Sequence, residues 1–187
     1  MPRRTSFGDL LAAGLILGLT RLGCAADFPK FENLKDSETR QQAKLSATEV
    51  KEIVDQVEAT AGDTPESWEA ELRFRRVRLG GVEGLLVRGS RLLCGATGNC
   101  TLWVFRKNSG RWVSLFTGSA PIADGFGFAP ESSHGIPNLV ISTNLSAAEA
   151  GYTVFTFDGR RYTASQCYRS VVRDGGGSPR TEAIACR

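Results

Sequence analysis

Histidine is the scarcest reactive residue in this sequence, and long apolar runs are almost as rare. One histidine occurs among 187 residues, so a site that needs two imidazoles cannot be built. Twenty-one glycines and seven prolines are too few and too irregularly spaced for collagen. The hydrophobic fraction of 41% is too high for a disordered chain and fits one domain with its own core. The formal net charge of +3 gives no reason to expect a nucleic-acid partner.

Residues 1–26 have the order of a secretory signal peptide. A basic start, Pro2-Arg3-Arg4, precedes an apolar run from Leu10 to Leu19, and the small residues Cys24-Ala25-Ala26 follow. We expect cleavage before Asp27 and a periplasmic or secreted product, since no other run is long enough to span a membrane. Two alternatives are lipidation at Cys24, because Leu22-Gly23-Cys24 resembles the end of a lipoprotein box, and an amino-terminal helix that stays attached.

The two parts of the chain that follow differ in the sign of their charge. Residues 27–71 contain five basic and twelve acidic side chains, and residues 72–187 contain fifteen basic and seven acidic ones. Regions of opposite sign can mark a surface for a partner. The simpler interpretation, which we favour, is that an acidic segment lies against a basic sheet of the same molecule.

Hydrophobic spacing predicts one main helix over residues 46–61. Ser46 and Glu49 have the spacing of a capping box, in which each side chain accepts from the other residue's backbone N–H. Gly62 is a typical helix stop. Between them, apolar residues recur at helical spacing and form one stripe: Val50, Ile53, Val54, Val57 and Ala61.

From Leu72 onward the hydrophobic period is two, as in β-strands. The pattern predicts strands at 72–79, 82–87, 101–106, 111–116, 139–143, 152–157 and 161–163. Turn residues join three pairs of these strands: Gly80-Gly81, Lys107-Asn108-Ser109-Gly110 and Asp158-Gly159. Within the first strand, Leu72 and Phe74 are out of phase with Val77 and Leu79, which predicts a bulge near Arg75-Arg76.

Together these patterns predict an α+β fold, in which an N-terminal helical segment packs on an antiparallel β-sheet domain stapled by disulfides. The predicted organisation is a signal peptide (1–26), an acidic helical segment (27–71), an antiparallel β domain (72–173) and a glycine-rich tail (174–187).

Four cysteines follow the predicted signal peptide: Cys94, Cys100, Cys167 and Cys186. An even number in an exported chain favours two disulfides, for which three connectivities exist. Glycines between Cys94 and Cys100 allow that loop to close; Cys167 with Cys186 would then pin the tail. A zinc site is less favoured, because five residues separate the first pair and structural zinc sites use two to four. No metal is expected.

His134 is the one candidate for imidazole chemistry, and it follows Ser132 and Ser133 in a predicted loop. Asp124 and Asp158 could orient its ring, but no serine has the G-x-S-x-G surroundings of a nucleophile elbow. A lone loop histidine is more often a surface residue. The sequence also has no phosphate-binding or dinucleotide-binding glycine motif, so no cofactor is expected.

Arginines of the strand at 72–79 form the strongest candidate binding surface. They are Arg73, Arg75, Arg76 and Arg78. In a strand, the first two project to one side and the last two to the other, and such rows can bind phosphate or carboxylate groups. We add Thr97 and Asn99 of the cysteine-bracketed loop, because loops on rigid sheets commonly carry recognition. The alternative is a solvated edge strand protected by its charge.

Four pieces of the chain carry a resemblance. In order they are Leu93-Cys94-Gly95-Ala96-Thr97-Gly98-Asn99-Cys100, Trp103-Val104-Phe105, His134-Gly135 before Asn138-Leu139-Val140, and Phe157-Asp158-Gly159 with Tyr162. Over residues 82–168 the chain resembles uncharacterised exported bacterial proteins with a Cys-Gly-x-x-Gly-Asn-Cys loop and a Phe-Asp-Gly hairpin. The piece ending at Val140 also resembles a degraded FG-GAP blade of the integrin type, without its acidic calcium loop. The resemblance implies an envelope location and a small β fold, and no known activity.

From these observations we expect a secreted or periplasmic, non-enzymatic module that binds a protein or an anionic envelope polymer. One alternative is a cell-wall or peptide hydrolase that uses His134. The other is a structural envelope protein that assembles with itself.

Overall fold

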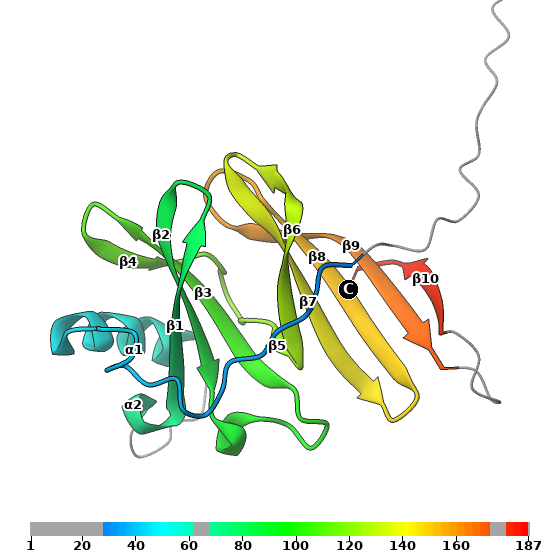
Figure 1. Ribbon diagram of the computed structural model, residues 1–187, viewed down its shortest axis with the longest axis horizontal. Helices are drawn as coiled ribbons and strands as arrows, with labels where there is room; N and C mark the ends of the chain where they lie inside the picture. Colours follow the sequence, from blue (N-terminus) through cyan, green and yellow to red (C-terminus); the bar gives the residue numbers. More distant parts are fainter. Residues whose placement is uncertain (1–27, 62–67, 173–178, 187) are drawn as a thin grey trace, which may run out of the picture.

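The computed structural model describes residues 28–61, 68–172 and 179–186. The predicted signal peptide, Cys24, the predicted helix stop and the glycines of the tail lie outside these ranges. The described chain forms mainly antiparallel sheets with one long helix, which confirms the α+β class (Figure 1). The elements are α1 (Ala47–Ala61), α2 (Trp68–Glu71), β1 (Leu72–Leu79), β2 (Val82–Gly89), η1 (Arg91–Leu93), β3 (Cys100–Asn108), β4 (Arg111–Ser114), β5 (Ile122–Ala123), β6 (Gly125–Ser133), β7 (Ile136–Ser146), β8 (Glu149–Phe157), β9 (Tyr162–Val171) and β10 (Arg180–Ile184).

The first sheet lies between the helices and the second sheet (Figure 1). Its strand order is β1-β2-β3-β4, with the short β5 beside β3, and the order in the second sheet is β10-β9-β8-β7-β6. The helix side of the first sheet buries one apolar cluster, which includes Ile53, Trp68, Phe74, Trp103 and Trp112. Its other side buries a second cluster against the second sheet, which includes Leu79, Leu86, Val104, Leu139 and Phe157.

Strand β1 contributes to both clusters, and the bulge predicted within it is wrong. It pairs with β2 without interruption, from Leu72 opposite Gly89 to Leu79 opposite Val82. Leu72 and Phe74 belong to the cluster under the helices, whereas Leu79 belongs to the cluster between the sheets. The hydrophobic phase changes because both faces of the strand are covered, each over a different part of its length.

Helix α1 begins as its capping box predicts. The N–H of Glu49 donates to Ser46 Oγ (3.2 Å), and the N–H of Ser46 donates to Glu49 Oε2 (3.0 Å). Val50, Ile53 and Val57 of the apolar stripe are buried. Residues 28–45, which we expected within a helical segment, form extended chain and turns instead.

Three predicted turns connect strands as expected, and three strands occur where none was predicted. The turns lie between β1 and β2, between β3 and β4, and between β8 and β9. In the last of these, Asp158 Oδ1 accepts from the N–H groups of Arg160 and Arg161, both at 2.8 Å. The strands without a prediction are the short β5, β6 and β10, the last within the predicted tail.

Residues 28–38, here called the N-terminal strap, cross from the second sheet to the first. Glu32 and Phe126 of β6 exchange two backbone hydrogen bonds (2.8 and 2.9 Å). Gly127 lies under Pro29 so closely that a Cβ on Gly127 would overlap the proline ring, which explains why a glycine is needed there. Aromatic contacts hold the start of the strap to β8 and β9: Phe28 and Phe31 against Tyr152, and Phe28 against Tyr168.

The two disulfides join Cys94 to Cys100 and Cys167 to Cys186, which confirms both favoured pairings. The first closes the loop between η1 and β3, here called the disulfide loop (residues 94–100). The second ties β9 to the chain just after β10. Within the described residues, no helix is both long and apolar enough to cross a membrane.

Candidate functional site

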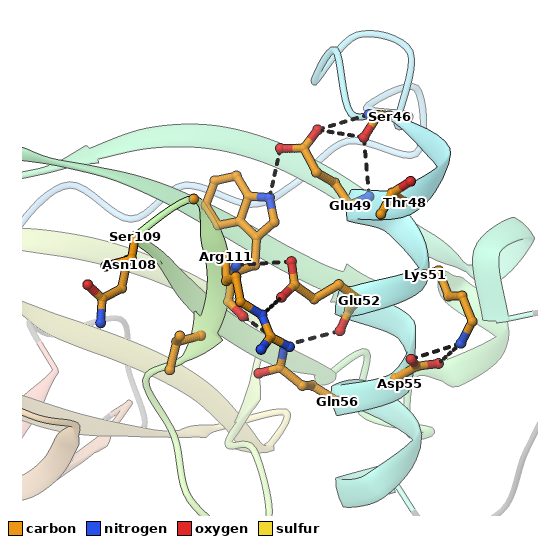
Figure 2. Close-up of a pocket in the computed structure, with 13 residues that line it drawn as sticks. Ser46, Thr48, Glu49, Lys51, Glu52, Asp55, Gln56, Asn108, Ser109 and Arg111 are labelled. Carbon is orange, nitrogen blue, oxygen red and sulfur yellow. Dashed lines mark hydrogen bonds and ion pairs between the residues drawn. The ribbon is translucent and has the colours of Figure 1, made fainter.

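A hollow lies between α1 and the β3–β4 hairpin (Figure 2) and has a volume of about 910 Å³. Gln56 donates to the carbonyl of Trp112 (2.9 Å) and accepts from the N–H of Ser114 (3.0 Å). Glu52 accepts from the N–H of Trp112 (3.2 Å). Side chains of α1 therefore satisfy the outer edge of β4, where a neighbouring strand would otherwise lie. The residues around this hollow, here called the helix–hairpin seam, hold α1 against the β3–β4 hairpin.

Glu49 is the most strongly held carboxylate of the seam. It accepts from Lys107 Nζ (2.9 Å), from Trp112 Nε1 (3.1 Å) and from the backbone and side chain of Ser46. The Lys107 hydrogen bond and then the Ser46 N–H lower the pKa of Glu49 to about 2. A carboxyl with that pKa is ionised at neutral pH, so it has no proton to give as a general acid.

We predict that Glu49→Gln lowers the free energy of unfolding at pH 7 by about 1–2 kcal/mol. The pKa of Glu49 is depressed in the folded state, so its contribution is present above the unfolded value of 4.5 and is lost as the pH falls toward 2. The difference between variant and parent, measured by urea unfolding at pH 7, 4 and 2.5, should therefore shrink in acid. Glu58→Gln, at an exposed position of the same helix, is the control. A constant difference at all three pH values would contradict the assignment.

The arginines singled out in β1 contact other parts of the same chain. Arg75 donates to both carboxylate oxygens of Glu38 (2.5 and 3.0 Å) and to Glu32 (2.9 Å). Arg76, on the opposite face, donates to the carbonyls of Ala43 (2.5 Å) and Lys44 (3.1 Å).

The other two arginines of β1 differ from each other. Arg73 donates to the carbonyl oxygens of Ala70 (2.9 Å) and Leu72 (3.0 Å) at the end of α2. Arg78 is exposed and forms no hydrogen bond or ion pair with its side chain inside the described ranges. The structure therefore divides the four arginines between two faces of the sheet, and it does not bring them together as one surface.

Ion pairs between the acidic segment and the basic sheet confirm that the two charged regions neutralise each other within one molecule. They join Glu32 and Glu38 to Arg75, Asp36 to Arg88, Glu49 to Lys107, and Glu52 to Arg111. Five acidic side chains of this segment are therefore neutralised within the fold. A binding site for an anion is best sought where basic side chains lie outside these pairs.

Basic charge is left over in a second hollow, between the strap and the disulfide loop, with a volume of about 690 Å³. Strap residues 33–36 form one wall, and Cys94, Gly95, Ala96, Gly98 and Cys100 of the disulfide loop form the other. Its charged residues are Lys35, Asp36, Arg88 and Arg91. In the described part of the chain, Lys35 and Arg91 have no ion-pair partner, so three cations face one carboxylate. We call this hollow the basic pocket.

Arg88 is the buried cation of the basic pocket, with 7% of its surface exposed. Its guanidinium donates to Asn33 Oδ1 (2.7 Å) and Asp36 Oδ1 (3.2 Å), and the buried Nε has no acceptor among the described residues. Burial lowers the pKa of Arg88, the charge of Asp36 opposes that shift, and the nearby charge of Arg73 adds to it. Asp36 is thus the one carboxylate that pairs with this buried guanidinium in the described chain.

Thr97 and Asn99 shape the disulfide loop. Asn99 is 5% exposed; its amide donates to Thr97 Oγ1 (2.7 Å) and to the carbonyl of Asn144 in β7 (2.8 Å), and it accepts from the N–H of Asn144 (2.8 Å). An asparagine that exchanges two hydrogen bonds with a backbone acts as a short piece of neighbouring strand. Asn99 therefore fixes the loop to the second sheet, and Thr97 stays exposed beside it.

His134 lies exposed in the turn between β6 and β7. Its Nδ1 is 2.9 Å from the carbonyl oxygen of Phe157, and since a carbonyl only accepts, Nδ1 carries the proton. Ser133 Oγ donates to Asn138 Oδ1 (2.9 Å), and Asp158 accepts backbone N–H groups of its own turn. The described contacts place the histidine as a link between two hairpins.

Sequence reasoning found the disulfide loop but missed Arg88, Arg91 and Lys35. The available signal was a charge directly after the apolar run Leu85-Leu86-Val87, at a position where strand alternation puts Arg88 on the same face as buried Leu86. Across the described ranges, no three His, Cys, Asp or Glu side chains gather where they could hold a metal ion. Comparisons of the chain with protein-family models, with curated proteins and with solved structures give no match.

Proposed function

We propose that this protein is a non-enzymatic binding module of the periplasm or cell exterior that captures an anionic envelope polymer at the basic pocket. The observation that carries the proposal is the excess of cations at this pocket, where exposed Lys35 and Arg91 flank the buried guanidinium of Arg88 and Asp36 is the one carboxylate among the lining residues. Arginine presents several N–H donors in one plane and binds carboxylate or phosphate groups strongly.

The location supports the same proposal. Two disulfides are compatible with an extracellular or periplasmic compartment. The order of residues 1–26 and the resemblance to exported bacterial proteins favour the same location. The disulfide loop forms one wall of the basic pocket, so the bridge between Cys94 and Cys100 holds part of the proposed site in one conformation.

A hydrolase that uses His134 receives less support from the contacts. Its Nδ1 faces a backbone carbonyl, while Ser133 and Asp158 bond to other groups. A catalytic histidine that activates a side-chain nucleophile would need that nucleophile within hydrogen-bond reach. Among the described residues, the one hydrogen-bond partner of the His134 ring is the carbonyl of Phe157.

The proposal predicts measurable binding of anionic polymers by the oxidised chain. In isothermal titration calorimetry at low salt, poly-L-glutamate and polyphosphate serve as carboxylate and phosphate probes, and dextran serves as the neutral control. We expect Arg91→Glu and Lys35→Glu each to weaken binding about tenfold, because each reverses a charge at the pocket. Added salt should weaken binding further.

Arg160→Glu is the matched control for these variants. Arg160 is equally exposed but lies in the turn between β8 and β9, so its reversal changes the net charge by the same amount without touching the basic pocket. An equal loss in Arg160→Glu would show that binding follows net charge alone. No binding of either anionic probe would refute the proposal.

A further inference from the structure

Strand β10, red in Figure 1, is the outer strand of the second sheet. Three other outer strands, β1, β4 and β6, are covered: the N–H of Phe74 in β1 donates to the Glu38 carbonyl (2.9 Å), β4 is covered by α1, and β6 pairs with Glu32. In the described chain β10 pairs with β9 alone. An uncovered strand edge is a template for another strand.

Charges on this edge alternate in sign. Arg169 of β9 pairs with Glu149 of β8 (2.5 Å) and lies opposite Glu182 of β10. Glu182 is 3.9 Å from Arg180 on the same strand. Because residues two apart in a strand share a face, all four side chains lie on one side of the sheet. At the open edge this row of charges ends with Glu182 and Arg180, whose side chains are both exposed.

We propose that β10 pairs antiparallel with β10 of a second copy, about a twofold axis at Thr181. In that register Arg180 of each chain lies directly opposite Glu182 of the other, and opposite charges at facing positions stabilise an antiparallel pair. A second copy is the occupant that this edge fits best, since a base and an acid placed symmetrically about one residue are complementary to themselves. The alternative axis at Glu182 would place two carboxylates face to face.

Two features next to β10 fit a short pairing of this kind. Pro179 precedes the strand, and because proline has no N–H, it ends the ladder at the position that would face Ala183 of the second copy. The Cys167–Cys186 disulfide holds the far end of β10 to β9, so the edge is already ordered before a partner arrives. The dimer would form one continuous ten-stranded sheet from two five-stranded ones.

The test is the mass of the oxidised chain by sedimentation equilibrium over a wide concentration range. We expect a concentration-dependent dimer in the parent protein. Arg180→Glu and Glu182→Arg should each raise the dissociation constant at least about tenfold, since each places like charges opposite one another. The double variant Arg180→Glu with Glu182→Arg should restore it, because the exchanged charges again face opposite ones.

A monomer at every concentration would overturn the proposal. A dimer that both single reversals leave unchanged, or a double variant no better than the single ones, would equally overturn it. The assay is independent of anion binding, so it separates this inference from the proposed function.

Discussion

Replacing Gly80 with alanine is expected to lower the free energy of unfolding by about 3 kcal/mol. Gly80 has a φ of +62°, a conformation that costs an L-residue about 1–2 kcal/mol. A Cβ there would also overlap the carbonyl oxygen of Gly135 in the turn between β6 and β7. Because backbone atoms cannot swing aside as a side chain can, the two turns would have to separate.

Gly81→Ala is the matched control for this prediction. Gly81 is the next residue of the same turn, and a Cβ there would meet no atom within 4 Å. Its replacement should change stability by less than about 0.5 kcal/mol. Urea unfolding followed by tryptophan fluorescence measures both variants. Equal effects would show that the β1–β2 turn does not interlock with the second sheet, and that loss of glycine flexibility alone explains the result.

Arg75→Met is expected to lower the free energy of unfolding by about 2–3 kcal/mol. The guanidinium donates to Glu38, to Glu32 and to the carbonyl of Asn33, and it lies over the ring of Phe126 at 5.7 Å. The side chains of Arg75 and Glu38 are 22% and 20% exposed, so this is a partly buried pair. Its loss leaves Glu32 and Glu38 without their cation and removes part of the contact between the strap and the first sheet.

The effect of Arg75→Met should depend on pH. Burial pushes the pKa of Glu38 upward, but hydrogen bonds from Arg75 and the Lys35 N–H outweigh it, so that the pKa lies below its ordinary value of 4.5. The stabilisation is therefore present above pH 4.5 and lost as the pH falls through the lower, folded-state pKa. Parent and variant should converge in acid when their unfolding is compared at pH 7 and pH 3.

Arg111→Met provides the comparison for an exposed pair. Arg111 is 82% exposed and pairs with Glu52, so its replacement should cost less than about 1 kcal/mol. If Arg111→Met and Arg75→Met destabilise the protein equally, the strap contributes no more than an ordinary surface ion pair. The position of Arg75 beneath the strap would then have no energetic importance.

Local signals were enough to predict part of this fold. The capping box at Ser46 and Glu49, the turns that follow Leu79 and Phe157, and the spacing of the cysteines each depend on residues close together in the sequence. Strand β6 escaped prediction because its glycines, Gly125 and Gly127, are typical of loops. Glycine is needed at these positions because Phe31 and Pro29, about a hundred residues earlier, pack against them. A pattern of neighbouring residues in the sequence does not reveal such a contact.

The candidate site was harder to predict for the same reason. Strand alternation correctly separates Arg75 from Arg76, but it cannot say that acidic strap residues cover one and backbone carbonyls the other. Arg88 directly follows the strand predicted at 82–87, and no local pattern singles it out. Its importance depends on the strap and the disulfide loop meeting above it, and that meeting is set by tertiary contacts alone.

The contacts of the strap also set the stage of synthesis at which folding can be completed. Its residues are made before either sheet, yet Glu32 pairs with Phe126, and Phe28 contacts Tyr152 and Tyr168. A chain interrupted before β6 would have no second sheet to receive the start of the strap. The start of the strap, although it is made first, can therefore pack on the second sheet only after β6, β8 and β9 have been made. Final ordering of the basic pocket, whose wall is the same strap, then waits for nearly the whole chain.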